Sequence, residues 1–292
     1  MLANPHTAPA VKTILCPIDF SEQSKFVVEH ALRVSEVFNA DITVLNVVDD
    51  MDAKYAAYRK TEKDLLMLRR TLEQDSQNQM TTQVATKFRN RDTKYGFVTA
   101  YGKAIDQIPR FSKEKNVGLI MMATRSAGLT NQFILGSTTY KIVRTAPCPL
   151  MIFSRPEQKF RALRILFPTD FSPLSFQALP YAYKFAKEYG SDFHLVHFHQ
   201  MHGEVFKESA KELETMKRDA TRNGVAHVTL NDEIKGVTPG SAILKYAKEN
   251  NIDLIVISAH GASGYKQFFL GSTAIDITSR SECPVLIVRK SE

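Results

Sequence analysis

The sequence contains no tryptophan, only three cysteines, and no apolar run that approaches the length of a membrane span. Three cysteines are too few for the disulfide framework of a secreted domain, and they suit a reducing compartment. Residues 1–10 are polar, contain proline and lack the basic-then-apolar order of a signal peptide. We therefore expect a cytoplasmic protein with no membrane partner and a disordered tail over residues 1–10.

Charge of one sign is also not concentrated along the chain. The formal net charge of +7 is compatible with nucleic-acid or acidic-lipid contact. However, basic and acidic residues alternate over 54–64 and 207–219, and the densest basic segment is the short stretch 87–94. A solvated face explains this spread better than a nucleic-acid footprint. We expect no nucleic-acid partner.

Three blocks of sequence occur twice in the same order. The pairs are ILCPIDFS (14–21) and ILFPTDFS (165–172), QFILGST (132–138) and QFFLGST (267–273), and CPLMIF (148–153) and CPVLIV (283–288). Recurrence in the same order indicates that a whole unit was duplicated. A chain of 292 residues accommodates two such units. We place repeat 1 at residues 11–154, a linker at 155–161 and repeat 2 at 162–292.

Strand and helix patterns alternate in each repeat. The predicted strands are 13–17, 41–48, 97–100 and 117–123 in repeat 1 and 164–168, 192–199, 229–234 and 252–259 in repeat 2, each followed by a closing strand after Cys-Pro. A charged helix is predicted over 53–76 and again over 205–223. The near-continuous apolar runs 117–123 and 252–259 are typical of strands buried on both faces of a parallel sheet.

Helix starts are marked by polar caps and proline. Ser21 and Ser172 stand where a helix N-cap is expected, and Pro173 suits a first helical position. Pro180 predicts a kink in the first helix of repeat 2. The alternation gives an α/β fold with two tandem doubly wound, five-stranded parallel sheets. The closing strands lie at sheet edges, so we expect them to pair antiparallel and form an intrachain pseudo-dimer.

The predicted fold places polar residues where parallel sheets bind ligands, beyond the carboxyl ends of the strands. Asp170 follows the first strand of repeat 2, and Gly271 and Ser272 open its last helix. An aspartate can accept a hydrogen bond from an adenine amino group or a ribose hydroxyl. A helix N-terminus offers amide donors and a positive dipole to phosphate. These residues therefore favour a nucleotide site.

The second repeat resembles the universal stress protein family. The resemblance rests on Pro168-x-Asp170-x-Ser172, the run Ser258-Ala-His-Gly261, nine further residues, Gly271-Ser272, and the closing Cys-Pro and apolar run. It covers almost the whole chain as two tandem copies. It implies an adenine nucleotide alpha hydrolase-like, Rossmann-like fold, cytoplasmic residence, pairing through the last strand, and a non-enzymatic stress-response role with an unidentified protein partner.

Nucleotide-binding members of this family carry two glycines in the loop after the fourth strand. Repeat 2 has Ser258 at the first position and Gly261 at the second, whereas repeat 1 has Ala123 and Ser126. The resemblance implies the ligand contacts Pro168, Asp170, Phe198, Ile257, Ser258, Gly261, Gly271, Ser272 and Thr273. Their repeat 1 counterparts are Asp19, Val47, Met122, Ala123, Ser126, Gly136, Ser137 and Thr138. We expect repeat 2 to bind ATP or AMP, with Mg²⁺ accompanying ATP, and repeat 1 to be degenerate.

Three alternatives stay open at this point. Asp19 and Asp170 can instead cap the turn before a helix, and both sites can have decayed to leave a nucleotide-free scaffold. The third is a metal site in the cluster of His194, His197, His199 and His202, near Glu204. On a strand His194 faces away from His197 and His199, which weighs against shared metal ligation. We find no nucleophile–base pair, predict no catalytic residue and leave open whether two chains associate.

Overall fold

The computed structural model describes residues 11–49, 62–89, 91–124, 135–155, 159–198, 206–234, 237–259 and 271–289. Repeat 1 contains β1 (Thr13–Ile18), α1 (Glu22–Phe38), β2 (Asp41–Val48), α3 (Glu62–Gln83), the 3₁₀ helix η2 (Ala85–Phe88), β3 (Tyr95–Tyr101), α4 (Ala104–Glu114), β4 (Leu119–Ala123), α5 (Ser137–Thr145) and β5 (Leu150–Phe153). Within these ranges no helix has the length and apolar character needed to cross a bilayer.

Repeat 2 follows the same order of elements. It contains β6 (Arg164–Thr169), α6 (Pro173–Phe176), α7 (Leu179–Tyr189), β7 (Asp192–Phe198), α8 (Phe206–Arg222), β8 (His227–Ile234), α9 (Pro239–Glu249), β9 (Leu254–Ser258), α10 (Ser272–Arg280) and β10 (Val285–Val288). The alternation of strands and helices predicted from the sequence is thus confirmed.

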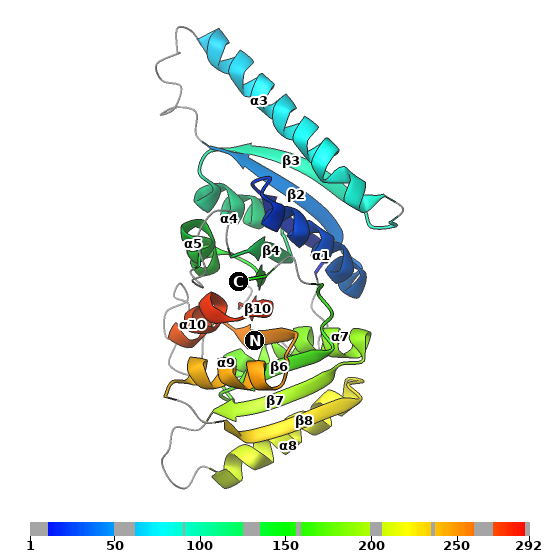
Figure 1. Cartoon of the computed structure of the whole chain (residues 1–292), viewed down its shortest axis with the longest axis vertical. Coiled ribbons are helices and arrows are strands. Elements are labelled where there is room, and N and C mark those ends of the chain that lie inside the picture. Colours follow the sequence, from blue (N-terminus) through cyan, green and yellow to red (C-terminus); the bar gives the residue numbers. More distant parts are fainter. Residues whose placement is uncertain are drawn as a thin grey trace.

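All ten of these strands belong to one sheet, in the order β3-β2-β1-β4-β5-β10-β9-β6-β7-β8 (Figure 1). Neighbouring strands run parallel except at the centre, where β5 and β10 pair antiparallel with Met151 opposite Leu286. The predicted doubly wound sheets and the pseudo-dimer through the closing strands are confirmed. Because the central pair is antiparallel, the carboxyl ends of the strands lie at opposite edges of the sheet in the two repeats.

Serine caps begin the first helix of each repeat, as predicted. The hydroxyl of Ser21 accepts a hydrogen bond from the Ser24 amide, and that of Ser172 accepts one from the Ser175 amide. Pro180 does more than kink the helix of repeat 2. It lacks the N–H that would bond to the Phe176 carbonyl, and the helix is interrupted between α6 and α7 where α1 is continuous.

The charged helix of repeat 1 extends beyond its predicted end at Ser76, because α3 continues to Gln83; the predicted start, 53–61, lies outside the described residues. Ser76 is buried and hydrogen-bonds to Asn46 Oδ1 at 3.0 Å and to Thr99 Oγ1 at 2.9 Å. The helix therefore packs partly through polar side chains, which hydrophobic periodicity does not reveal. Figure 1 shows α3 at the outer end of the sheet, beside β3.

Two pseudo-symmetric hydrogen bonds join the repeats beside the central strand pair. Ser154, which follows β5, donates its hydroxyl to the Ser281 carbonyl at 2.6 Å, at the end of α10. Arg289, which follows β10, donates from Nη2 to the Val143 carbonyl at 2.6 Å, in the last turn of α5. Burial lowers the pKa of the Arg289 guanidinium. Each repeat therefore supplies a donor to carbonyls that the other's closing helix leaves unpaired.

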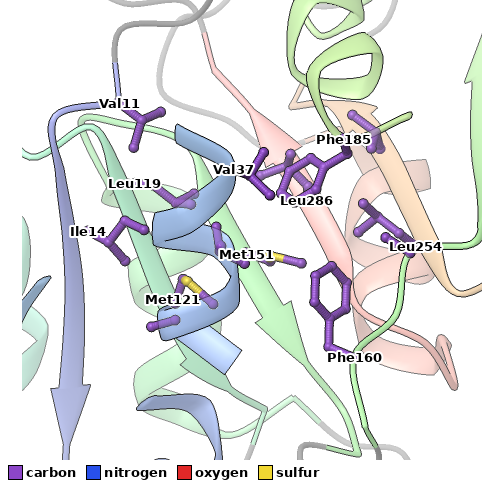
Figure 2. Packing of buried hydrophobic residues seen from close by; sticks show 14 of the residues in the cluster. Val11, Ile14, Val37, Leu119, Met121, Met151, Phe160, Phe185, Leu254 and Leu286 are labelled. Atoms are coloured by element: carbon purple, nitrogen blue, oxygen red, sulfur yellow. The ribbon is translucent and has the colours of Figure 1, made fainter. Parts of the chain in front are cut away.

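Phe160, in the expected linker, belongs to the hydrophobic core. Its side chain is 3% exposed, and its ring centroid lies 6.0 Å from that of Phe153 and 6.1 Å from that of Phe185. Figure 2 shows it pointing into a cluster that contains Met151 of repeat 1 and Leu254 of repeat 2. Phe160 therefore packs against both repeats.

Truncation of this ring should destabilise the protein strongly. We expect Phe160→Ala to lower the free energy of unfolding by about 3–5 kcal/mol, and Phe160→Leu, which keeps most of the apolar volume, by under about 1.5 kcal/mol. The control Leu163→Ala, at a side chain that is 48% exposed, should change it by less than about 0.5 kcal/mol. Urea titration measures all three. Equal effects of Phe160→Ala and Leu163→Ala would show that the segment is only a tether.

His194 is the buried titratable group of β7. Its Nδ1 lies 2.8 Å from the Tyr246 hydroxyl, and its Nε2 lies 3.2 Å from Asp192 Oδ2 without the alignment of a hydrogen bond. Burial lowers the pKa of His194; Asp192 opposes that shift, and Arg164 adds to it. The imidazole is therefore held neutral inside the fold.

This burial predicts acid sensitivity. Between the lowered folded pKa of His194 and the ordinary value of about 6.5, only the unfolded chain binds the proton, so stability falls as pH decreases below about 6.5. We expect His194→Gln to flatten the fall in unfolding free energy by up to about 1 kcal/mol per pH unit. Urea titrations over a pH series measure it, with His227→Gln, at an exposed position, as the control. An unchanged slope in His194→Gln would contradict the assignment.

Candidate functional site

The reversal of strand order in repeat 2 lies between β6 and β9. The chain runs from β6 outward to β7 and β8 and then returns to β9 on the other side of β6. The carboxyl ends of β6 and β9 are neighbours, because the two strands pair parallel. Ligands of open parallel sheets bind in the crevice at such a point. Asp170 follows β6 and Ser258 ends β9, so both stand at this edge.

The turn after β6 has a fixed and strained geometry. Asp170 Oδ1 accepts a hydrogen bond from the Ser172 amide at 3.0 Å, and Thr169 Oγ1 accepts one from the Phe171 amide at 3.0 Å. Phe171 has φ 58°, a left-handed conformation that is uncommon for a bulky residue. Asp170 thus caps a turn, one of the alternatives left open by the sequence. Its side chain is also exposed at the ligand edge.

Repeat 1 builds the same turn. Asp19 Oδ1 accepts hydrogen bonds from the Ser21 amide at 3.1 Å and from the Ser21 hydroxyl at 2.5 Å, and Phe20 has φ 61°. A strained residue kept in both copies points to a constraint on where the aspartate lies. Residue identity gives little warning of it, since phenylalanine rarely adopts positive φ.

A polar side chain on the neighbouring strand holds each turn, a role that was not predicted from the sequence. His197 Nδ1 lies 2.8 Å from the Thr169 carbonyl, and its ring stacks on Phe171 with centroids 4.5 Å apart. Asn46 Nδ2 donates to the Ile18 carbonyl at 3.0 Å in repeat 1. His197 and Asn46 occupy equivalent positions in the two repeats. A polar residue at the same strand position in both copies is the sequence signal that could have indicated this role.

The last helix of each repeat begins at the same edge. The Gly271 amide donates to the Ala259 carbonyl at 2.9 Å and ties the start of α10 to the end of β9; the Gly136 amide likewise donates to the Thr124 carbonyl at 2.8 Å. Neither helix has a side-chain cap at its N-terminus. First-turn amides and the helix dipole are therefore available to an anion.

The backbone conformation at Gly271 does not require glycine. Its φ of −61° and ψ of 147° suit any residue, as do the values of −58° and 148° at Gly136. What glycine provides here is the absence of a side chain, which permits close approach. Gly261 and Ser126, the second loop positions of the two repeats, lie outside the described residues.

The remaining predicted contacts lie at or near the same edge of the sheet. Ile257 is 5% exposed in β9, while Ser258 and Phe198 end their strands partly exposed. Ser272 is exposed and Thr273 partly exposed in the first turn of α10. Pro168 is a partly exposed residue of β6. The structure thus brings to one edge every predicted contact of repeat 2 that it describes.

Repeat 1 differs at its helix start. Thr139 donates its hydroxyl to the Ala123 carbonyl at 3.1 Å and is 5% exposed. Its counterpart in repeat 2 is Ala274, which has no such donor. The edge formed by Met122, Ala123 and the start of α5 therefore contains an internal side-chain bond that repeat 2 lacks. The predicted counterparts Asp19, Val47, Gly136, Ser137 and Thr138 stand at the carboxyl ends of the repeat 1 strands or at the start of α5.

His194 and His197 of β7 lie on opposite faces of the sheet. His194 contacts Tyr246 on one face, and His197 packs on Phe171 on the other. Among the described residues no group of three histidine, cysteine, aspartate or glutamate side chains could hold a metal ion. His199, His202 and Glu204 lie outside the described residues. The opposite orientation predicted for His194 is confirmed.

The thiols are poor nucleophiles in this fold. Cys16 and Cys148 are buried and Cys283 is partly exposed. Burial raises the pKa of Cys148 to about 12 and that of Cys283 to about 11. A thiol with such a pKa stays protonated at neutral pH, and the thiolate is the reactive form.

Comparison with known proteins agrees with this geometry. The sequence profile of the Universal stress protein family matches residues 10–154 and again 162–289. The universal stress protein YxiE of Bacillus subtilis is 33% identical over 150 residues, 43% of this chain and 98% of that protein. The universal stress protein MJ0531 of Methanocaldococcus jannaschii is 30% identical over 142 residues, 44% of this chain and 82% of that protein.

The fold has a counterpart among solved structures that spans both repeats. The crystal structure of a universal stress protein from Archaeoglobus fulgidus superposes with a TM-score of 0.75, covers 96% of this chain and 98% of its own, and shares 24% sequence identity. That likeness concerns the fold alone. With the two profile matches and the relatives, the repeated sheets identify this chain as a tandem member of the universal stress protein family.

Proposed function

We propose that repeat 2 binds an adenine nucleotide, ATP or AMP, and that the protein acts in the cytoplasm as a non-enzymatic stress-response module. One observation carries the proposal. At the switch point of the repeat 2 sheet, an uncapped helix N-terminus is tied by its Gly271 amide to the residue after β9, on the edge that also holds Asp170.

The chemistry of these groups suits the parts of a nucleotide. The Asp170 carboxylate accepts a hydrogen bond from the adenine amino group or a ribose hydroxyl. Phe198, which is partly exposed at the end of β7, offers apolar surface to the base. The first-turn amides of α10 and the hydroxyls of Ser272 and Thr273 donate to phosphate oxygens. Mg²⁺ accompanies the nucleotide when ATP is bound.

Hydrolysis of ATP at this edge should be slow or absent. Among the described residues we identify no side chain placed as a general base, and the His197 imidazole is used to hold the turn at Thr169. Binding would instead change the surface at the start of α10. A protein partner could then distinguish the bound from the free state.

A nucleotide-free scaffold is the second candidate function. It is favoured by the turn bond of Asp170 to Ser172 and by Ser258, a side chain where nucleotide-binding relatives of this family carry glycine. In that account both crevices are filled by protein. The two functions predict opposite results when nucleotide is titrated into the protein: heat of binding for the first and none for the scaffold.

Substitution of the helix-entry glycines tests the proposal and compares the repeats. We expect heat of binding when ATP, ADP or AMP is titrated into the wild type, and its loss in Gly271→Val, because the valine side chain occupies the phosphate position. The variant should fold, since φ −61° and ψ 147° are open to valine. Gly136→Val, which has matching backbone angles in repeat 1, should retain binding.

The outcomes separate the two functions. No heat with any of the three nucleotides at millimolar concentration would support the scaffold. Loss of binding in Gly136→Val with retention in Gly271→Val would place the site in repeat 1 and contradict the assignment.

A substitution that introduces glycine at position 258, as in nucleotide-binding relatives, tests the same site through an expected gain in affinity. We expect Ser258→Gly to tighten nucleotide binding severalfold, because it removes a side chain from the end of β9 next to the crevice. Isothermal titration measures the change, and Ala123→Gly in repeat 1 is the matched control and should leave affinity unchanged. Weaker binding in Ser258→Gly would show that the serine contacts the ligand.

A further inference from the structure

A second concave surface lies away from the nucleotide edge, at the amino ends of β9 and β10. It is a groove of about 790 Å³ between the connecting segment and the carboxyl ends of α9 and α10. Six cationic side chains line it: Arg155, Lys159, Arg161, Lys245, Lys248 and Arg280. Only two carboxylates, those of Asp253 and Glu282, join them.

The charges in this groove are partly neutralised, but a positive excess remains. Glu282 lies 3.3 Å from Arg155 and 3.9 Å from Lys248. Arg280 pairs with Asp276 at 3.0 Å and Lys245 with Glu249 at 3.9 Å. Among the residues that the structure describes, Lys159 and Arg161 have no ion-pair partner. Cationic side chains in a concave, partly enclosed surface raise the local potential for an anionic ligand.

Favourable interaction with helix dipoles explains the position of only some of these cationic side chains. Lys248 and Arg280 stand in the last turns of α9 and α10, where a cation is favourable in any case. Lys159 and Arg161 belong to no helix. In addition, the position of Arg280 is held by Thr145 in repeat 1, so the full cluster belongs to repeat 2 alone.

The uncharged lining indicates the kind of anion. Leu244, Cys283 and Pro284 are partly exposed in the groove and offer apolar contact between the charges. Phe160, the aromatic residue of the lining, is 3% exposed and so presents no face on which a base could stack. Glu282 and Asp253 can accept N–H donors, which a peptide backbone has and a phosphodiester backbone lacks.

We propose that this groove binds an acidic segment of a partner protein, in which carboxylates alternate with apolar side chains. Carboxylates of the segment meet the six cations, its apolar residues lie on Leu244 and Pro284, and its amides reach Glu282. The groove lies at the amino ends of the repeat 2 strands and the nucleotide edge at their carboxyl ends. Occupation of the groove is therefore independent of whether repeat 2 binds nucleotide.

Fluorescence anisotropy of a short labelled peptide of alternating Glu and Leu, titrated with the full chain at low ionic strength, tests the proposal. We expect binding that weakens with added salt and is lost when Gln replaces Glu in the peptide. Lys245→Glu/Lys248→Glu should weaken binding by about tenfold or more, as should Lys159→Glu/Arg161→Glu, because each reverses two charges of the groove.

The two repeats supply a matched control. Arg110→Glu/Lys113→Glu makes the same charge change at the equivalent positions of α4, where Arg110 pairs with Glu114 as Lys245 pairs with Glu249. This variant should retain affinity within about twofold. Equal losses in both helix variants would reduce the effect to net charge and overturn the proposal. So would an absence of peptide binding, or tighter binding of a single-stranded oligonucleotide than of the peptide.

Discussion

The antiparallel pairing of β5 with β10 is the interaction on which the rest of the structure depends. Both strands are fully buried, and each would be an exposed edge if its repeat stood alone. The pairing turns two five-stranded sheets into one continuous sheet. It brings Ser154 and Arg289 to the closing helices of the opposite repeats and buries Phe160 between them.

The same pairing separates the two ligand edges. The carboxyl ends of the repeat 1 strands lie at the edge where the repeat 2 strands begin, so the turns at Asp19 and Asp170 lie at opposite edges of the sheet. Each repeat can then diverge without disturbing the other. Repeat 1 has no glycine at its two loop positions and bonds Thr139 to Ala123, whereas repeat 2 keeps Gly261 and has Ala274 at the helix start.

Much of this architecture could be predicted from residue patterns. The duplicated blocks, the buried runs before Ala123 and Ala259, and the caps at Ser21 and Ser172 each have a local physical cause. The patterns failed where structure depends on tertiary contacts. The length of α3 is supported by the buried polar bonds of Ser76, and the burial of Phe160 in a presumed linker arises only when the two repeats meet. The effect of Pro180 is local and was predicted as a kink, and the structure shows a full break between α6 and α7.

The candidate site was predictable as a set of residues, while its internal geometry was not. Strand order alone brings Asp170, Ser258 and Gly271 to one edge. The left-handed Phe171 and the support of its turn by His197 follow from packing between strands that no spacing rule encodes.

Native mass spectrometry of the full chain with ATP tests the central claim most directly, because it counts ligands per molecule. The account predicts one nucleotide per chain; two, or none, would contradict it.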